Sequence, residues 1–336
     1  MKGLLKYFMK QLFFLIFTIF IGTTIIFLLS RLSPVNPIDI ILSRLASIGA
    51  RISSEEHAQM KATFMRLYGL DKPIFQQYIL FMQGFIKGDL GPSFSFFPKK
   101  VIDLIRESMP WTIGLLASAT IISWIIGNLL GAIAGYFSDK KWSKILENIF
   151  LVMYPMPYVI LALIIALLFV YLIPVFPYMG GTPMGIERTF SLKFILGVIK
   201  HAFLPALSVI IASLSGWFLS MRALTLNTKT EVYVDYAELR GLPKKKIMRS
   251  YIFRNSLLPQ ITALALNLGF IFNGSMITEN IFAYPGLGYL MYYAIVNGDY
   301  NLMVGIATFA IIGICLGIFI VEMFLPFIDP RIRYEE

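Results

Sequence analysis

The chain has few of the residues that build disulfides, metal sites and catalytic centres. It contains one cysteine, Cys315, within an apolar run, and two histidines, His57 and His201, far apart in the sequence. A disulfide within the chain is therefore excluded, and no Cys/His cluster has the spacing of a metal site. No GxxxxGK[ST] loop is present to hold a nucleotide phosphate, and no kinase or hydrolase signature occurs. The sequence predicts a chain that is not an enzyme and that binds no metal or cofactor itself.

Charged residues are also scarce. They make up 14% of the 336 residues, whereas hydrophobic residues make up 57% and the mean hydropathy is +0.74. Soluble domains carry about 25% charged residues, so this composition predicts a membrane protein. The net charge of +10 favours Lys and Arg residues that set topology near anionic lipid, rather than binding to nucleic acid.

Six apolar runs approach or exceed the roughly 20 residues that cross a bilayer as a helix. They lie at about 10–31, 111–137, 147–172, 202–221, 256–280 and 303–328. The first run has no small-residue cleavage site and is expected to stay as an uncleaved span. Prolines inside several runs do not exclude helices, because neighbouring helices satisfy the freed carbonyls. We expect an all-α, polytopic membrane protein with six transmembrane helices.

Basic residues orient these predicted spans. They gather in alternate connections, beginning with the N-terminus: Lys2, Lys6 and Lys10; Lys140, Lys141 and Lys144; eight residues from Arg222 to Arg254; and Arg331 and Arg333. The connection 283–302 carries none. The positive-inside rule places both termini in the cytoplasm, and the basic residues of 32–110 do not oppose this because long loops translocate largely regardless of charge.

The polar segment 32–110 is predicted to be an extracytoplasmic helical segment. Ser53 and Glu56 have capping-box spacing before a helix through about Leu67, and a second amphipathic helix is expected at 74–86. The chain then divides into an N-terminal transmembrane helix (1–31), this segment, and a five-helix transmembrane core (111–336). The segment is expected either to contact an extracytoplasmic solute-binding protein or only to shield the mouth of a pore.

A polar, basic island, 231–259, lies between two apolar spans. It has the pattern of a helix up to Arg240, a break at Gly241 with positive φ, and a second helix with Pro243 in its first turn. Since the chain has no nucleotide site, any ATP must be hydrolysed by another chain, and this island is the place for a soluble motor to dock. The alternative is a basic loop that binds anionic lipid.

Small and acidic residues inside the spans point to packing and to a pathway. Gly127, Gly131 and Gly135 recur every four residues, as do Gly313 and Gly317, which predicts close helix crossings within the chain or with a second subunit.

Ionisable residues in spans are costly. We expect Glu279, with Asn267 and Asn273, to be a pathway candidate, although Glu279 near an interface can also simply reach headgroup water; Glu322 is expected to pair with a basic neighbour.

The island resembles the EAA-type loop of ABC importer permeases in the oligopeptide, dipeptide and nickel family. The resemblance covers nearly the whole chain. The matching motifs are Tyr233-Val234, Ala237, Gly241-Leu242, Arg254-Asn255-Ser256-Leu257-Leu258-Pro259, Pro34-x-Asn36-Pro37, Tyr68-Gly69-Leu70-Asp71-Lys72-Pro73, Gln77-Tyr78, Gly88-Asp89-Leu90-Gly91, Pro155, Pro157, His201, Leu204-Pro205, Pro285-Gly286-Leu287-Gly288 and Asp329-Pro330-Arg331-Ile332-Arg333. The departures are Ala237-Glu238-Leu239-Arg240 before the glycine, Val35-Asn36 after the first span, and an enlarged 40–66.

The resemblance implies the type I ABC importer permease fold in a prokaryotic cytoplasmic membrane. It implies a second, homologous permease, two ATPase subunits that bind ATP and Mg, and an extracytoplasmic solute-binding protein. Within the coupling loop 228–259, it assigns contact with an ATPase subunit to Tyr233, Ala237, Glu238, Arg240, Gly241, Leu242 and Pro243.

Family members carry peptides, nickel or oligosaccharides. The sequence 111–116 and the enlarged outer segment look slightly more like sugar-importing members, and nickel is the weakest option because no ligand pathway is evident. Oligosaccharides and oligopeptides both stay open as solutes. Outside the family, the alternatives are an ion- or proton-coupled secondary transporter or channel without an ATPase, for which no repeat between the chain halves is found, and a scaffold that recruits a soluble partner.

Overall fold

The computed structural model describes residues 2–32, 38–40, 43, 53–67, 69–177, 179–183, 185 and 191–328. Within them the secondary structure is helical, and no strand forms; the only β contact is an isolated bridge between Pro92 and Lys100. The helices are α1 (Lys2–Arg31), α3 (Ser54–Leu67), α4 (Ile74–Ile86), α5 (Val101–Tyr136), α6 (Lys141–Met153), α7 (Tyr158–Ala166), η1 (Leu167–Leu172), α8 (Leu192–Lys229), α9 (Val232–Leu239), α10 (Lys244–Lys246), η2 (Ile247–Phe253), α11 (Arg254–Phe270), η3 (Ile271–Asn273), α12 (Met276–Ile281), α13 (Leu287–Asn297) and α14 (Tyr300–Ile328).

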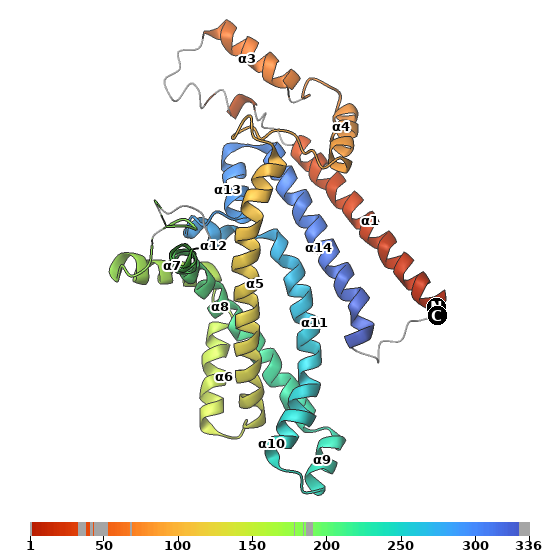
Figure 1. Ribbon diagram of the computed structural model, residues 1–336, viewed down its shortest axis with the longest axis vertical. Coiled ribbons are helices and arrows are strands. Elements are labelled where there is room, and N and C mark those ends of the chain that lie inside the picture. Colours follow the sequence, from red (N-terminus) through yellow and green to blue (C-terminus); the bar gives the residue numbers. More distant parts are fainter. Residues whose placement is uncertain are drawn as a thin grey trace.

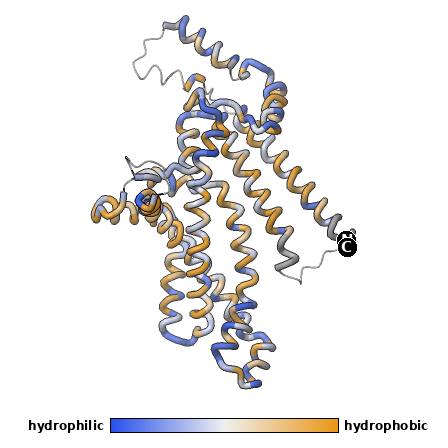
Figure 2. Tube along the Cα trace, in the orientation of Figure 1, coloured by the Kyte–Doolittle hydropathy of each residue, from blue (hydrophilic) through white to orange (hydrophobic). Residues whose placement is uncertain are grey.

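The molecule has two polar ends with mostly hydrophobic helices between them (Figure 1 and Figure 2). Figure 1 shows α3 and α4 at one end and α9 and α10 at the other; α5 and α11 lie between these ends, and α14 and α1 lie beside α11 and stop short of α9 and α10. Hydrophilic residues gather at these two ends, and the connecting helices are mostly hydrophobic (Figure 2). This division is the one expected when the middle of the molecule lies in lipid.

Four helices of the described chain are long and apolar enough to cross a membrane: α1, α5, α8 and α14. The prediction of six single spans is corrected in two places. The run 147–172 is not one helix: α6 and the α7–η1 pair meet at 95° across Tyr154–Pro157, where Pro155 and Pro157 remove backbone donors. The run 256–280 is also divided, because α11 ends at Phe270 and Gly274, with φ +73°, separates it from α12.

The predicted glycine stripes lie at helix crossings within the chain. On α5, a Cβ added to Gly127 or Gly131 would lie 2.5 Å from α8, at Trp217 Cβ and at Phe218 O respectively. A Cβ on Gly135 would lie 2.8 Å from Thr225 Cβ, so all three glycines are required for the approach of the two backbones. This confirms the expected close packing and places it between α5 and α8.

A second crossing joins α14 to α11. A Cβ on Gly317 would lie 2.6 Å from the Cα of Gly269, and one on Gly313 would collide with the Phe272 ring. On its other side α14 packs antiparallel to α1: Tyr7 Oη donates to the Glu322 carbonyl at 3.3 Å near one end, and Gly22 faces Ile311 further along. The core elements therefore order as α8, α5, α11, α14 and α1 by their contacts.

The described part of the segment 32–110 contains both predicted helices. Ser53 and Glu56 form the expected capping box: Ser53 N donates to Glu56 Oε2 at 2.8 Å, and Glu56 N donates to Ser53 Oγ at 3.2 Å. These bonds lower the pKa of the Glu56 carboxyl, because hydrogen bonds favour its ionised form. Helix α4 has the predicted bounds, whereas α5 starts at Val101 rather than at 111, with Pro110 inside it.

Buried Asp299 anchors the loop that leads into α5. Its carboxylate accepts hydrogen bonds from Ser93 Oγ at 2.5 Å and from Ser95 N at 2.8 Å, while its other oxygen accepts from Leu302 N at 3.1 Å in the first turn of α14. One carboxylate thus caps α14 and holds the loop across its end.

Candidate functional site

The polar island folds as the predicted helix–glycine–helix element. Helix α9 ends at Leu239, and Gly241 has φ +68°, the positive value expected from the sequence. No atom lies within 4 Å of a Cβ added to Gly241, so backbone conformation rather than space requires glycine there. Pro243 immediately precedes α10 instead of occupying its first turn.

One side of α9 is buried against the chain itself. Val234 and Ala237 form a cluster with Ile247 and Ile252 of η2, and Ala237 is only 3% exposed. Ala237 was expected on the face that meets a partner, but it lies against η2. Its small side chain therefore lets α9 sit close to η2 and does not form the outer surface.

The other side of α9 is an exposed apolar face. Val232, Tyr236 and Leu239 are 64%, 64% and 83% exposed. Their spacing of four and three residues puts them on one face of the helix. This α9 face, defined by these three residues, was not predicted from the sequence, although the same spacing is present there.

The remaining predicted coupling residues surround α9 in different roles. Tyr233 accepts a hydrogen bond from Asn255 Nδ2 at 3.2 Å and so ties α9 to the start of α11. Glu238, Arg240 and Pro243 are exposed, and Leu242 packs against the buried cluster. The predicted set therefore divides into residues that hold α9 in place and residues that face solvent.

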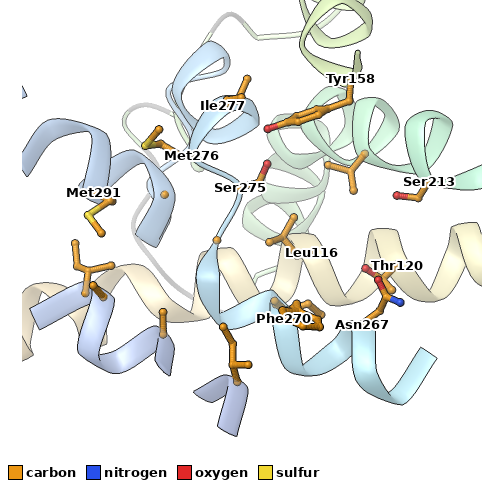
Figure 3. Close-up of a pocket in the computed structure, with 18 of the residues that line it drawn as sticks. Leu116, Thr120, Tyr158, Ser213, Asn267, Phe270, Ser275, Met276, Ile277 and Met291 are labelled. Atoms are coloured by element: carbon orange, nitrogen blue, oxygen red, sulfur yellow. The ribbon is translucent and has the colours of Figure 1, made fainter. Parts of the chain in front are cut away.

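A cavity of about 960 Å³ lies between the long helices and α12–α13. Its polar lining comes from several elements: Thr120 from α5, Tyr158 from α7, Ser213 from α8, Asn267 from α11, and Ser275 before α12. Figure 3 shows these side chains around a common space with Leu116, Phe270, Met276, Ile277 and Met291. The volume falls within the range of about 300–1,000 Å³ typical of small-molecule sites.

The described lining of the cavity carries no charged side chain. Its polar groups are hydroxyls and one carboxamide, which donate and accept hydrogen bonds without a net charge. Asn267 Nδ2 donates to Ala263 O one turn earlier at 2.9 Å, which fixes the orientation of the amide. The cavity is therefore suited to a solute recognised by hydrogen bonds and apolar contact rather than by ion pairing.

Of the predicted pathway residues, Asn267 lines the cavity. Glu279 is fully buried behind it: its carboxylate accepts hydrogen bonds from Thr112 Oγ1 at 2.8 Å, Gly288 N at 2.7 Å and Tyr289 N at 3.0 Å. Glu279 thus caps the start of α13. This role differs from both roles that the sequence suggested for Glu279, which were to line the pathway or to reach headgroup water. The side chain of Asn273 lies outside the described residues.

Comparison with known proteins identifies the family. A family model described as "Binding-protein-dependent transport system inner membrane component" matches residues 127–334, more than half of the chain. Aligned over 98% of its length, the chain is 29% identical to the whole of the oligopeptide transport system permease protein OppB of Haemophilus influenzae. It is 27% identical to OppB of Escherichia coli K12 and 24% identical to the dipeptide transport system permease protein DppB of Lactococcus lactis, with the same coverage of this chain and the whole of each relative.

These matches confirm the resemblance deduced from the motifs. The all-α architecture, the cluster of long apolar helices and the matched region agree with a multi-pass protein of the inner membrane. The chain is therefore a member of the binding-protein-dependent transport system inner membrane component family, the permease component of ABC importers.

Proposed function

We propose that this chain is one of two permease subunits of an ATP-driven importer of oligopeptides. It forms half of the translocation pathway and receives the motion of a separate ATPase through α9. The observation that carries the proposal is the α9 face: three apolar side chains stand exposed on a short helix whose opposite side is buried. Exposed apolar clusters of this kind mark protein contacts, and Val232, Tyr236 and Leu239 match the groove-docking spacing of a helical ligand.

Helix α9 is linked to the cavity through η2, on which it packs, and through the helix that continues from η2. Val234 and Ala237 pack on η2, and η2 runs directly into α11 and η3 without a break. Asn267 and Phe270, near the far end of α11, line the cavity. A push on α9 therefore reaches the cavity through packed side chains and one helical rod, which is the kind of rigid element that transmits a conformational change.

The proposed solute is an oligopeptide rather than an oligosaccharide. The relatives are named as oligopeptide or dipeptide permeases, and the slight preference for sugar that the sequence suggested has no support among them. An uncharged lining of hydroxyl, carboxamide, methionine and aromatic groups can hydrogen-bond to peptide amides while accepting varied side chains.

The proposed partners are those of the family: a second, homologous permease, two ATPase subunits that hold ATP and Mg, and an extracytoplasmic solute-binding protein. In this arrangement α9 and both termini face the cytoplasm, and α3 and α4 face outward. The apolar surfaces of α1 and α7 lie in lipid or against the second permease.

The test is to replace Leu239 with Glu and measure two properties in one preparation. We expect the variant to reach the membrane normally, to lose co-purification of the ATPase, and to lose ATP-dependent uptake of a labelled tetrapeptide, because a carboxylate in an apolar contact is left without a partner. Asp235→Ser, at a polar exposed position of the same helix, is the matched control and should retain both.

Two outcomes would contradict the proposed mechanism of transport, and a third would contradict the proposed solute. If Leu239→Glu kept the ATPase bound and transported normally, the α9 face would not be the contact. If peptide uptake continued after ATP was depleted and followed a proton or sodium gradient, the chain would be a secondary transporter. Uptake of a labelled trisaccharide in place of the tetrapeptide would overturn the solute assignment alone.

A further inference from the structure

A groove of about 410 Å³ follows the seam between α1 and α14, and its lining shares no residue with the cavity or with α9. The lining comes from Lys10, Gln11, Phe14, Leu15 and Thr18 of α1 and from Cys315, Ile318, Phe319 and Glu322 of α14. On α1 these positions form the series 10, 14 and 18 and the pair 11 and 15, and on α14 they are 315, 318, 319 and 322, so each helix contributes one face to the groove.

The groove is polar at one end and apolar at the other. Because α1 and α14 are antiparallel, Lys10 lies level with Glu322, Phe14 with Ile318, and Thr18 with Cys315. The apolar span of α1 begins at Lys6 and that of α14 ends at Met323. Lys10 and Glu322 therefore lie at the depth of the lipid headgroups, and the aromatic and aliphatic part lies at the depth of the acyl chains.

The two charged residues at the polar end make no ion pair with a described residue. Glu322 was expected to pair with a basic neighbour; its carbonyl accepts from Tyr7, but its carboxylate makes no hydrogen bond within the described chain. Lys10 is exposed, and Glu322 is half-buried. A carboxylate at this depth is costly unless hydrogen-bond donors or a cation compensate it.

From this arrangement we propose that the α1–α14 groove binds a phospholipid with a zwitterionic, primary-amine headgroup of the phosphatidylethanolamine type. Lys10 attracts the phosphate, and Glu322 accepts hydrogen bonds from the ammonium group. One acyl chain lies along Phe14, Leu15 and Ile318. Lys10 alone would favour an anionic lipid; the carboxylate beside it repels a second negative charge and selects the zwitterion. A quaternary choline headgroup has no N–H to donate, so it is the weaker ligand.

The test measures lipids retained by the full-length chain. The protein is placed in nanodiscs with equal parts of dioleoyl phosphatidylethanolamine, phosphatidylcholine and phosphatidylglycerol, and bound lipid is counted by native mass spectrometry after stepwise delipidation. The wild type should retain phosphatidylethanolamine preferentially. Glu322→Gln should lower that retention about tenfold, the loss expected for one hydrogen bond to a charged group, without lowering retention of phosphatidylglycerol.

Three further variants separate charge from space. Lys10→Gln should lower retention of both phosphatidylethanolamine and phosphatidylglycerol. Thr18→Trp should expel the lipid by filling the apolar end without changing any charge. Lys6→Gln, an exposed basic position on the same helix outside the groove, is the matched control and should behave as the wild type.

The proposal is overturned if the wild type retains the three lipids equally or retains none. It is equally overturned if Glu322→Gln and Thr18→Trp keep the wild-type preference. Loss of the bound lipid from the wild type when a second permease subunit is co-expressed would show that the groove is a subunit interface instead.

Discussion

At the scale of single residues, Glu279 illustrates how a buried carboxylate is compensated without a cation. Its three hydrogen bonds come from the Thr112 hydroxyl and from two backbone amides at the start of α13. Thr112 also accepts a hydrogen bond from Leu287 N at 2.7 Å. The carboxylate therefore joins α5, α12 and α13, three elements that border the cavity.

We expect Glu279→Ala to destabilise the protein by about 3 kcal/mol, because it leaves buried donors unpaired. Glu279→Gln keeps one acceptor oxygen and should cost less. The measurement is the thermal midpoint of the purified chain in detergent, followed by size-exclusion fluorescence. Glu238→Ala, which removes an exposed carboxylate, is the control, and a midpoint for Glu279→Ala equal to that of this control would contradict the assigned role.

At the scale of elements, the crossing of α5 and α8 sets the frame on which the cavity is built. Gly131 lies where the two backbones are closest. Replacing it with leucine must push α8 away from α5 or disrupt the packing of both helices. We expect the free energy of unfolding to fall by at least about 3 kcal/mol, the upper part of the range for overpacking. Gly114→Leu, on the same helix where nothing lies within 4 Å of an added Cβ, is the matched control.

The readout is the yield of monodisperse protein and its thermal midpoint. A normal yield and midpoint for Gly131→Leu, together with wild-type behaviour of Gly114→Leu, would mean that the crossing tolerates separation and is not the frame proposed above.

Elements defined by local chemistry were predictable from the sequence. The capping box at Ser53, the bounds of α4 and the positive φ of Gly241 all depend on nearby residues. The 95° bend between α6 and α7 was not predictable in this way. Hydropathy averages over a window and registers that 147–172 is apolar, but the direction of the chain after Pro157 depends on packing against α8 and α12.

The candidate site was predicted in part for a similar reason. Motifs located α9 and its glycine, but they did not tell which side of the helix is buried. Ala237 belongs to the matching motif and faces inward, whereas Leu239, outside it, is the most exposed of the α9 face. A motif residue can be required for packing within the chain as well as for contact with a partner, and Ala237 packs on η2.

At the scale of the whole molecule, the two polar ends should lie on opposite sides of the membrane. Cys315 is the sole cysteine, so Cys315→Ser gives a background without thiols. In that background we expect Gln76→Cys, exposed on α4, to react with an impermeant maleimide from outside intact cells, and Glu238→Cys, exposed on α9, to react only after permeabilisation. Reaction of both positions from the same side would contradict the topology.

The continuous helix from η2 through η3 also determines how much movement α9 can produce. From Ile247 to Asn267 the axis is about 30 Å long at a rise of 1.5 Å per residue. A rod of that length, tilted by about 10° around its α9 end, displaces its other end by roughly 5 Å. That displacement is close to the diameter of a peptide backbone, so a modest rotation imposed on one short helix has enough amplitude to open or close the passage beside Asn267 and Phe270.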